Sequence, residues 1–251
     1  MNLVIDVGNT AIKIGLFKEK ELLSKSEFSS HPPKGIDEWG ILLSIWINRV
    51  EKESIINKVI IASVVSSVST SIKTSIKKYF KLVPIEVSSD IVKIPFLCHN
   101  PRKLGADRIA NIVAACKLYK LPAIIIDFGT ATTFDVISKK GEYLGGVIAP
   151  GIISSLESLS EKTEKLFSID FKKPNRVIGK NTEENLTSGI FYYSLGGVRE
   201  ILKRVKEEIK EEEIEVIATG GLGELLGKEC KEIKQVNPDL TLQGLNLIGE
   251  E

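Results

Sequence analysis

The sequence predicts an α/β protein of two related halves, each a mixed five-stranded sheet with helices. The first observation is a repeat, because Val4–Thr10 (VIDVGNT) is similar to Ile125–Ala131 (IIDFGTA) and both are apolar runs that reach Asp-x-Gly. Counted between the two aspartates, the offset is 127 − 6 = 121 residues, about half of the 251-residue chain. The second observation is that β-type runs follow each repeat, and amphipathic stretches follow the runs. This order is typical of a sheet covered by helices.

In the first half, three apolar runs separated by short turns predict an antiparallel meander. Strands and helices then alternate, which indicates further strands added to the same sheet. The resulting order is β-β-β-α-β-α-β. After the run that reaches Asp6, the elements are strand Ala11–Phe17, the turn Lys18-Glu19-Lys20, a third run, helix Ile36–Val50, strand Lys58–Val64, helix Val68–Phe80 and the short strand Val83–Val87.

The second half repeats this order loosely. A second β-type run and a turn again follow the Asp-x-Gly segment, and a third run precedes the helical stretches. The elements are strand Thr132–Ile137, the turn Lys139-Lys140-Gly141, a third run, helix Ile152–Leu159, a long helix from Thr182 to about Ile209, strand Ile214–Ala218, a glycine-broken helical piece and a short strand near Ile233–Val236.

The expected connection between the halves is the helix Ala106–Lys120. Leu121-Pro122 follows it, and proline is common just after a helix end. We therefore expect an N-terminal half over residues 1–119, with the first turn and this helix. The C-terminal half would cover residues 120–251, with the second turn.

Composition excludes several classes of protein. With 34 Lys+Arg and 33 Asp+Glu, the net charge of +1 gives no footprint for nucleic acid or for a membrane surface. No apolar run approaches the length that spans a bilayer. Cys98, Cys116 and Cys230 form no CxxC pair or even set, which favours a reducing, cytoplasmic location. The two histidines, His31 and His99, lack zinc-ligand spacing, so a metal would be held by oxygen.

Two turns carry the candidate chemistry. Asp6-Val7-Gly8-Asn9-Thr10 puts a carboxylate at a strand end, a glycine that allows close backbone approach, and polar donors beside it. These groups suit a Mg²⁺-phosphate, although a single such segment is equally compatible with an ordinary hairpin turn. The second copy, Asp127-Phe128-Gly129-Thr130, favours two turns that grip a polyphosphate.

Other glycine motifs give weaker signals. Thr219-Gly220-Gly221 follows an apolar strand and would let the backbone lie against an adenine or ribose, but a plain strand-to-helix turn needs small residues too. Gly227-Lys228 precedes glutamate instead of the Ser or Thr of a phosphate-binding loop. Gly221-x-Gly223 has Leu226 where a dinucleotide motif has its third glycine.

In this order, the two Asp-x-Gly turns and Thr219-Gly220-Gly221 resemble the phosphate and adenosine elements of the actin, sugar-kinase and Hsp70 superfamily, whose domains are ribonuclease H-like. Within that superfamily the chain is similar, essentially end to end, to type III pantothenate kinase. The motifs that carry this resemblance are Asn100-Pro101-x-x-Leu104-Gly105-Ala106-Asp107-Arg108, Asp127-x-Gly129-Thr130-Ala131-x-Thr133, Gly145-Gly146-x-Ile148-x-Pro150-Gly151 and Asn181-Thr182.

The resemblance implies ATP-dependent phosphorylation of pantothenate to 4′-phosphopantothenate, the first step of coenzyme A biosynthesis. It implies Mg²⁺ and K⁺ or NH₄⁺ as cofactors, and a homodimer. Asp107 would be the general base, and Asp127 would hold the monovalent cation. Asp6 would hold Mg²⁺ through the phosphates. The ATP site would comprise Asp6, Val7, Gly8, Asn9, Thr10, Ala11, Ile12, Lys13 and Thr130. The pantothenate site would comprise Cys98, Gly105, Ala106, Asp107, Arg108 and Thr182, with Cys98 standing where the family usually has a tyrosine.

The chemistry leaves alternatives open. A carboxylate placed to accept the alcohol's proton suffices for phosphoryl transfer, yet an acid in a first helical turn also interacts with the helix dipole. Arg108 could bind the pantothenate carboxylate or form a surface ion pair. The alternative functions are a non-catalytic nucleotide-binding regulator on the same fold and a kinase of another small alcohol.

Overall fold

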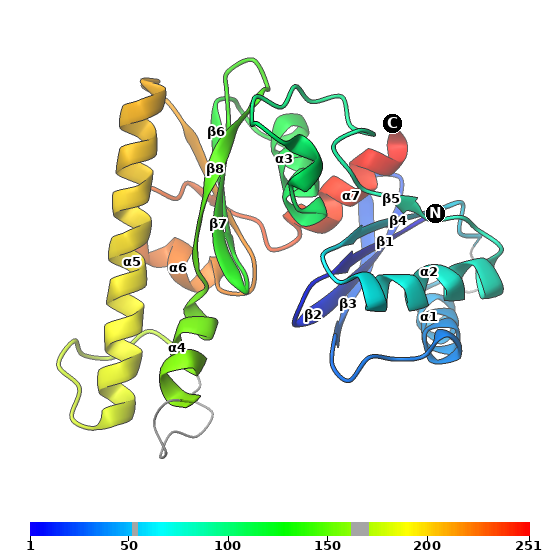
Figure 1. Cartoon of the computed structure of the whole chain (residues 1–251), viewed down its shortest axis with the longest axis horizontal. Coiled ribbons are helices and arrows are strands. Elements are labelled where there is room, and N and C mark those ends of the chain that lie inside the picture. Colours follow the sequence, from blue (N-terminus) through cyan, green and yellow to red (C-terminus); the bar gives the residue numbers. More distant parts are fainter. Residues whose placement is uncertain (52–54, 162–170) are drawn as a thin grey trace. The chain divides into compact units, whose positions relative to one another are not determined.

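The chain folds as two units, each organised around a meander of three antiparallel strands (Figure 1). The computed structural model describes residues 1–51, 55–161 and 171–251. Met1–Tyr119 and Asp239–Glu251 form the first unit, and Lys120–Pro238 form the second. No helix in the described ranges is long and apolar enough to cross a membrane.

The first unit contains a five-stranded sheet in the order β3-β2-β1-β4-β5. The first three strands are antiparallel, whereas β4 and β5 are added parallel to β1. The predicted order β-β-β-α-β-α-β is therefore confirmed in this half. The elements are β1 (Asn2–Val7), β2 (Ala11–Lys18), β3 (Glu21–Ser29), α1 (Ile36–Val50), β4 (Lys58–Ser63), α2 (Ser66–Phe80) and β5 (Ile85–Glu86).

The two faces of this sheet are covered by different helices. Alternation along β1 sends Leu3, Ile5 and Val7 to the face packed against α1 and α2, where Trp39 is buried. The opposite face carries Val4 and Ile60 and packs against α3 (Ala106–Leu118) and α7 (Leu240–Glu250). A 3₁₀ turn at Pro101–Lys103 leads into α3. The second face is also the one that the start of α3 covers.

The second unit repeats the sheet in the order β10-β9-β6-β7-β8, which corresponds strand for strand to the first. One face of this sheet packs against α4, α5 and α6, through residues such as Phe134, Phe191 and Leu226. The elements are β6 (Ala123–Phe128), β7 (Ala131–Ile137), β8 (Tyr143–Pro150), α4 (Ile152–Glu161), α5 (Thr182–Ile209), β9 (Glu215–Thr219), α6 (Gly223–Glu229) and β10 (Gln235–Val236).

The C-terminal segment differs from the expected division. Residues 239–251 cluster with the first unit instead of the C-terminal half, because α7 lies along α3. A Cβ at Gly244 would lie 2.6 Å from the Ala110 carbonyl carbon, so glycine lets the two helix backbones approach closely. Asn246 adds polar ties, donating to the Glu19 carbonyl (2.7 Å) and accepting from the Asn2 side chain (3.0 Å). The helix expected to connect the halves is α3, and it lies in the first unit, where the expected division at residue 119 puts it.

Candidate active site

The turn between β1 and β2 is held rigidly by its own backbone and by buried Ser30. The Gly8 amide donates to the Ala11 carbonyl (3.0 Å). The Ser30 hydroxyl donates to the Gly8 carbonyl (2.7 Å), and the Ser30 amide donates to the Thr10 carbonyl (3.0 Å). A Cβ at Gly8 would lie 2.9 Å from the Ala11 carbonyl oxygen, so this position requires glycine. Asn9 and Thr10 remain exposed at the tip, where a ligand can reach them.

A carboxylate and an ammonium group lie on adjacent strands beside this turn. Asp6 is paired with Lys13 in the antiparallel register and with Ala62 in the parallel one. Because Val7 and Ile12 pack in the core under α1 and α2, alternation places Asp6 and Lys13 on the opposite face. That is the face covered by α3 and α7, so the Asp6–Lys13 pair shares it with the candidate substrate helix.

The first turn of α3 carries the second group of candidate residues. Gly105 is the N-cap, and Ala106 and Ile109 anchor the turn in the core while Asp107 and Arg108 stay half-buried. Asp107 Oδ1 accepts a hydrogen bond from the Arg108 amide (2.8 Å), so the carboxylate folds back over the helix start. A Cβ at Gly105 would lie 2.4 Å from that oxygen. Glycine at position 105 therefore makes this carboxylate position available.

The turn between β6 and β7 is one residue shorter than the first, because Phe128 pairs with Thr132 whereas Val7 pairs with Ile12. The Gly129 amide donates to the carbonyl two residues on, that of Ala131 (3.1 Å), whereas the Gly8 amide donates to the carbonyl three residues on. Residues at the start of α4 support it from outside, because Ser154 Oγ donates to the Thr130 carbonyl (2.9 Å). A Cβ at Gly151 would lie 2.8 Å from the Gly129 carbonyl oxygen, which explains a glycine there. Thr130 is exposed at the tip.

Asp127 lies between two threonines. The register pairs it with Thr133 on β7 and with Thr219 on β9. Both threonine hydroxyls are buried, and neither has a hydrogen-bond partner among the described residues. Gly220 has a φ of +83°, and a Cβ there would lie 2.7 Å from the Phe128 backbone nitrogen and would overlap Asp127 Oδ1. The sheet thus combines one carboxylate with two unused hydroxyl oxygens, all of them oxygen donors that suit a hard cation.

Thr182 is the first residue of α5, and its side chain is exposed. The helix start is well capped, because Asn181 Oδ1 accepts from the Glu184 amide (2.8 Å) and Glu184 Oε2 accepts from the Lys180 amide (2.9 Å). The cap fixes the backbone that carries Thr182.

Comparison with known families identifies the chain. A family model for type III pantothenate kinase matches residues 2–204, a segment that contains both Asp-x-Gly turns, the start of α3 and the start of α5. The chain belongs to the type III pantothenate kinase family. The predicted family and its kinase class are thereby confirmed.

Full-length relatives agree with this family. A type III pantothenate kinase of Geobacter sp. (strain M21) is 42% identical over 252 residues, covering 100% of this chain and 99% of the relative. One from Agathobacter rectalis is 39% identical over 251 residues, covering 99% and 96%. Among solved structures, a protein from Sinorhizobium meliloti described as a 2-dehydro-3-deoxygalactonokinase has a TM-score of 0.60 at 10% identity, covering 100% and 96%. Together with the paired five-stranded sheets, this likeness confirms the actin-like fold.

The structure distributes the predicted site residues of this pantothenate kinase family member between the two units. Val7 and Ile12 are fully buried in the core, so only their backbone can contact a ligand. Cys98 is half-buried in the segment before α3. The first unit holds Asp6, Val7, Gly8, Asn9, Thr10, Ala11, Ile12, Lys13, Cys98, Gly105, Ala106, Asp107 and Arg108, and the second holds Asp127, Thr130 and Thr182.

Sequence reasoning did not predict the contacts that support these groups, although Gly151 stood inside a recognised motif. Ser30, Ser154 and Gly151 brace the two turns, and Thr133 and Thr219 flank Asp127. Thr133 and Thr219 stood inside recognised motifs, but only the strand register shows that they share one carboxylate as a neighbour.

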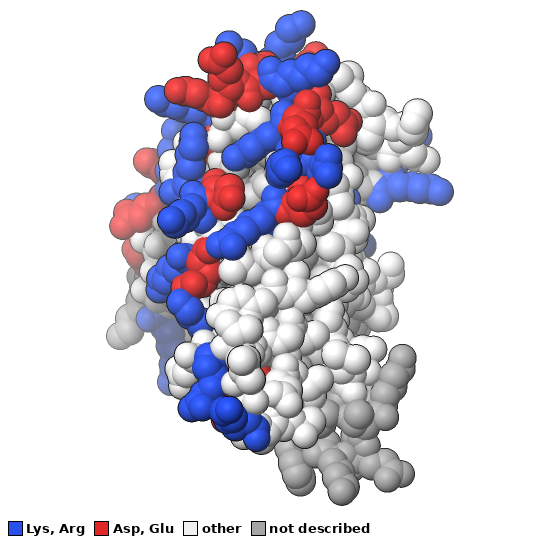
Figure 2. All heavy atoms as spheres, turned by 90° about the vertical axis from the view of Figure 1, so that its left-hand side faces the viewer, with Lys and Arg blue, Asp and Glu red and all other residues white. Residues whose placement is uncertain are grey.

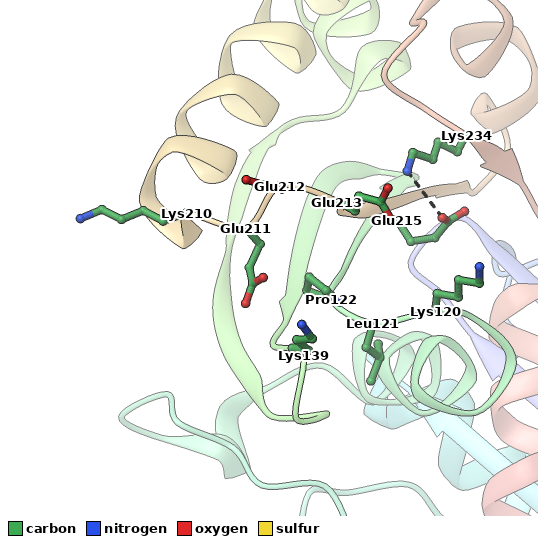
Figure 3. A pocket seen from close by; sticks show the side chains of 10 residues that line it. All are labelled: Lys120, Leu121, Pro122, Lys139, Lys210, Glu211, Glu212, Glu213, Glu215 and Lys234. Carbon is green, nitrogen blue, oxygen red and sulfur yellow. Dashed lines mark ion pairs between the residues drawn. The ribbon is translucent and has the colours of Figure 1, made fainter.

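A charged pocket of about 400 Å³ lies elsewhere in the second unit (Figure 3). It is near Pro122, which precedes β6, whereas Asp127 stands at the other end of that strand. Glu215 accepts a hydrogen bond from Gln235 (3.0 Å) and pairs with Lys234 (3.9 Å). This pocket is therefore separate from the Asp127 turn. Its lining is Lys120, Leu121, Pro122, Lys139, Lys210, Glu211, Glu212, Glu213, Glu215 and Lys234.

Proposed function

We propose that the chain transfers the γ-phosphoryl group of ATP to the primary hydroxyl of pantothenate, giving 4′-phosphopantothenate in the first step of coenzyme A biosynthesis. The observation that carries this proposal is the first turn of α3. There the Asp107 carboxylate folds over Gly105, on the sheet face that also bears Asp6 and Lys13. Full-length similarity to proteins named type III pantothenate kinase supports pantothenate as the acceptor.

Asp107 acts as the proton acceptor in this proposal. The pantothenate oxygen forms its bond to the γ-phosphorus while the bond to the ADP oxygen breaks, and the hydroxyl proton passes to the Asp107 carboxylate. Phosphoryl transfer depends mainly on positioning and charge stabilisation, so a carboxylate is a sufficient base. Its hydrogen bond from the Arg108 amide (2.8 Å) holds one oxygen in place, and the second oxygen can face the substrate.

The other proposed contacts to pantothenate come from residues near Asp107 and from Thr182. The Arg108 guanidinium has the geometry to bind the pantothenate carboxylate through two hydrogen bonds. Gly105 and Ala106 present backbone at the same helix start, and Thr182 presents an exposed hydroxyl at the start of α5. Cys98 would contact pantothenate from the position of the family's usual tyrosine.

The two turns hold ATP in this proposal. Asn9, Thr10 and Thr130 are exposed at the turn tips, and Lys13 supplies positive charge beside Asp6. Mg²⁺ on the phosphates, next to Asp6, would neutralise charge on the transferring group, and K⁺ or NH₄⁺ would bind at Asp127. The described residues contain no group of three or more His, Cys, Asp or Glu that could hold a metal.

A homodimer is part of the proposal, and the outer face of α5 supports it. Charged side chains gather over the C-terminal part of this helix, whereas the surface over its N-terminal part is largely uncharged (Figure 2). There Tyr193 is 85% exposed, and Gly189 and Gly196 face open space. An uncharged surface with an exposed aromatic residue suits contact with a second copy of the same surface.

We also propose a cytoplasmic location. All three cysteines are free, which suits a reducing compartment.

The experiment that tests the reaction is an ADP-release assay with the purified full chain, ATP, Mg²⁺ and K⁺, across pantothenate, glycerol and hexoses. The proposal expects turnover with pantothenate and a product heavier by one phosphoryl group in mass spectrometry. Turnover with glycerol or a hexose, but not with pantothenate, would contradict pantothenate as the substrate. Binding of ATP without turnover of any acceptor would favour the alternative function, a non-catalytic nucleotide-binding regulator.

A further inference from the structure

Three polar side chains meet on one face of the second sheet. Ile126 and Phe128 pack in the core beneath α4 and α5, so alternation turns Asp127 to the other face. The register places Thr133 on one side of it and Thr219 on the other. Residues directly opposite in an antiparallel pair, as Asp127 and Thr133 are, have Cβ atoms about 4.5–5.5 Å apart. Thr219 lies on the parallel neighbour β9, and adjacent strands of a sheet are about 4.7–4.9 Å apart. The two hydroxyls and the carboxylate are therefore within reach of one common ion.

The two threonine hydroxyls are buried and unsatisfied within the part of the chain that the structure describes. Thr219 is 1% exposed, and the hydroxyl oxygens of Thr133 and Thr219 are buried without a hydrogen bond to any part of the chain that the structure describes. A buried polar group without a partner destabilises the folded state, and such groups in native proteins generally have a reason. Asp127 has bonding partners of its own, and so does Asp135, which lies one register step further along, opposite Ile125.

Glycines keep space open at the carboxylate. A side chain at Gly220 would overlap Asp127 Oδ1, and the Gly220 φ of +83° disfavours other residues as well. On the other side, a Cβ at Gly129 would lie 3.5 Å from the same oxygen. Glycine at both positions thus leaves Asp127 Oδ1 uncovered, whereas a larger residue there would crowd this oxygen.

The first unit provides an internal comparison. Its sheet has the same strand order, and Asp6 stands where Asp127 stands in the second. The neighbours of Asp6 are Lys13 and Ala62, whereas those of Asp127 are Thr133 and Thr219. One carboxylate therefore has a lysine as its neighbour on the adjacent strand, and the other has two neutral oxygen donors.

We propose that Thr133 and Thr219 are ligands, together with Asp127, of a bound monovalent cation such as K⁺. In the first sheet, the residue paired with the corresponding carboxylate, Asp6, is the positively charged Lys13. This inference rests on the proposed assignment of the cation to Asp127 and adds two residues to it. One carboxylate and two neutral hydroxyls balance a single positive charge. Mg²⁺ prefers a small octahedral site made mainly of carboxylates, phosphates and water.

The test compares melting temperatures of the full chain in KCl and in NaCl at equal ionic strength, with ADP and Mg²⁺ present in both. The variants are Thr133→Val and Thr219→Val, which keep the side-chain shape and remove the hydroxyl. Ser75→Ala is the matched control, because Ser75 also has a buried hydroxyl without a partner among the described residues, but it lies in the first unit.

The proposal expects K⁺ to raise the melting temperature of the wild type more than Na⁺ does. In Thr133→Val and Thr219→Val, the K⁺ concentration for the half-maximal shift should rise at least about tenfold, which is the scale of losing one ligand interaction of 1.4 kcal/mol. In NaCl both variants should melt at or above the wild-type temperature, because an unsatisfied hydroxyl is gone. Ser75→Ala should keep the wild-type K⁺ response.

An unchanged K⁺ midpoint in either valine variant would overturn that residue's role as a ligand. Pantothenate phosphorylation by the wild type, measured at saturating K⁺, separates this outcome from failure of the proposed reaction. Turnover without a K⁺-specific shift would contradict the cation site alone. A shift that both valine variants lose, in a chain that does not phosphorylate pantothenate, would support the site and contradict the reaction.

Discussion

Replacement of Gly105 by alanine should separate catalysis from folding. The Gly105 φ of −59° suits alanine, so the backbone tolerates the change. The added Cβ would lie 2.4 Å from Asp107 Oδ1, whereas real Cβ contacts essentially never fall below 3.0 Å. The carboxylate must therefore move by at least 3.0 − 2.4 = 0.6 Å. It also strains or loses its hydrogen bond from the Arg108 amide.

A displacement of this size is large for a catalytic base. A misplacement of about 1 Å can cost roughly 10²-fold in rate, so we expect kcat of Gly105→Ala to fall about 10- to 100-fold. The clash is with the end of a side chain and can be relieved by its rotation, so the melting temperature should stay near that of the wild type. Initial rates of ADP release with saturating pantothenate and ATP, together with a thermal melt, measure both quantities.

Gly35→Ala is the matched control. Gly35 is the N-cap of α1, and its added Cβ would lie 3.2 Å from the Glu38 carboxylate, away from the proposed base. It should keep wild-type turnover. The double variant Gly105→Ala/Asp107→Asn should be no slower than Asp107→Asn, because the alanine acts through the carboxylate. Wild-type kcat in Gly105→Ala, or additive losses in the double variant, would refute this reasoning.

Three further predictions concern other parts of the chain. Cys98 should be the first cysteine to react with a maleimide at pH 7.5, because burial raises the pKa of the Cys116 thiol to about 11 and Cys230 is buried. Pantothenate should slow this reaction, and a labelling rate that pantothenate leaves unchanged would remove Cys98 from the pantothenate site. Gly244→Ala should lower the melting temperature by roughly 2–12 °C, because the added methyl group would press on the Ala110 backbone and overpacking lowers the free energy of unfolding by about 1–3 kcal/mol. An unchanged melting temperature would contradict the close approach of α7 to α3. Tyr193→Glu should shift a dimer to monomer in light scattering, whereas Lys203→Glu on the charged part of α5 should not, and a dimer that survives Tyr193→Glu would exclude this surface.

The repeated strand order could be predicted because local sequence encodes it. Buried strands are continuous apolar runs, and the Asp-x-Gly segments mark the same turn twice. In both turns the glycine amide donates to a carbonyl at the start of the next strand, Gly8 to Ala11 and Gly129 to Ala131, although the second turn is one residue shorter. Elements that depend on short-range pattern were therefore found with bounds that differ by only a few residues.

Helix α7 could not be predicted in the same way. Gly244 and Gly249 lie within 11 helical residues and favour a break on propensity alone. Their reason is tertiary, because Gly244 lies against the Ala110 carbonyl and Gly249 against Ile60. Packing on a helix more than a hundred residues earlier also places this segment in the first unit. Only the folded chain contains that information.

In the candidate site, too, residues close together in sequence could be predicted, whereas neighbours brought together by folding could not. Asp107 and its glycine are neighbours in sequence, so a local motif identified them. Thr133 and Thr219 are brought beside Asp127 by strand pairing, over a separation that no local pattern reveals. Ser30 likewise reaches the first turn from the end of β3.

In the proposed reaction, Asp107 accepts the proton of the pantothenate hydroxyl. The most direct measurement is kcat for pantothenate-dependent ADP release by Asp107→Asn, with Asp37→Asn as the control. Asp37 is also an acid in the first turn of a helix, on α1, so it tests the helix-dipole explanation. We expect kcat to fall at least about 100-fold in Asp107→Asn with an unchanged melting temperature, and to stay near the wild-type value in Asp37→Asn. Near wild-type turnover in Asp107→Asn would contradict the proposed role of Asp107.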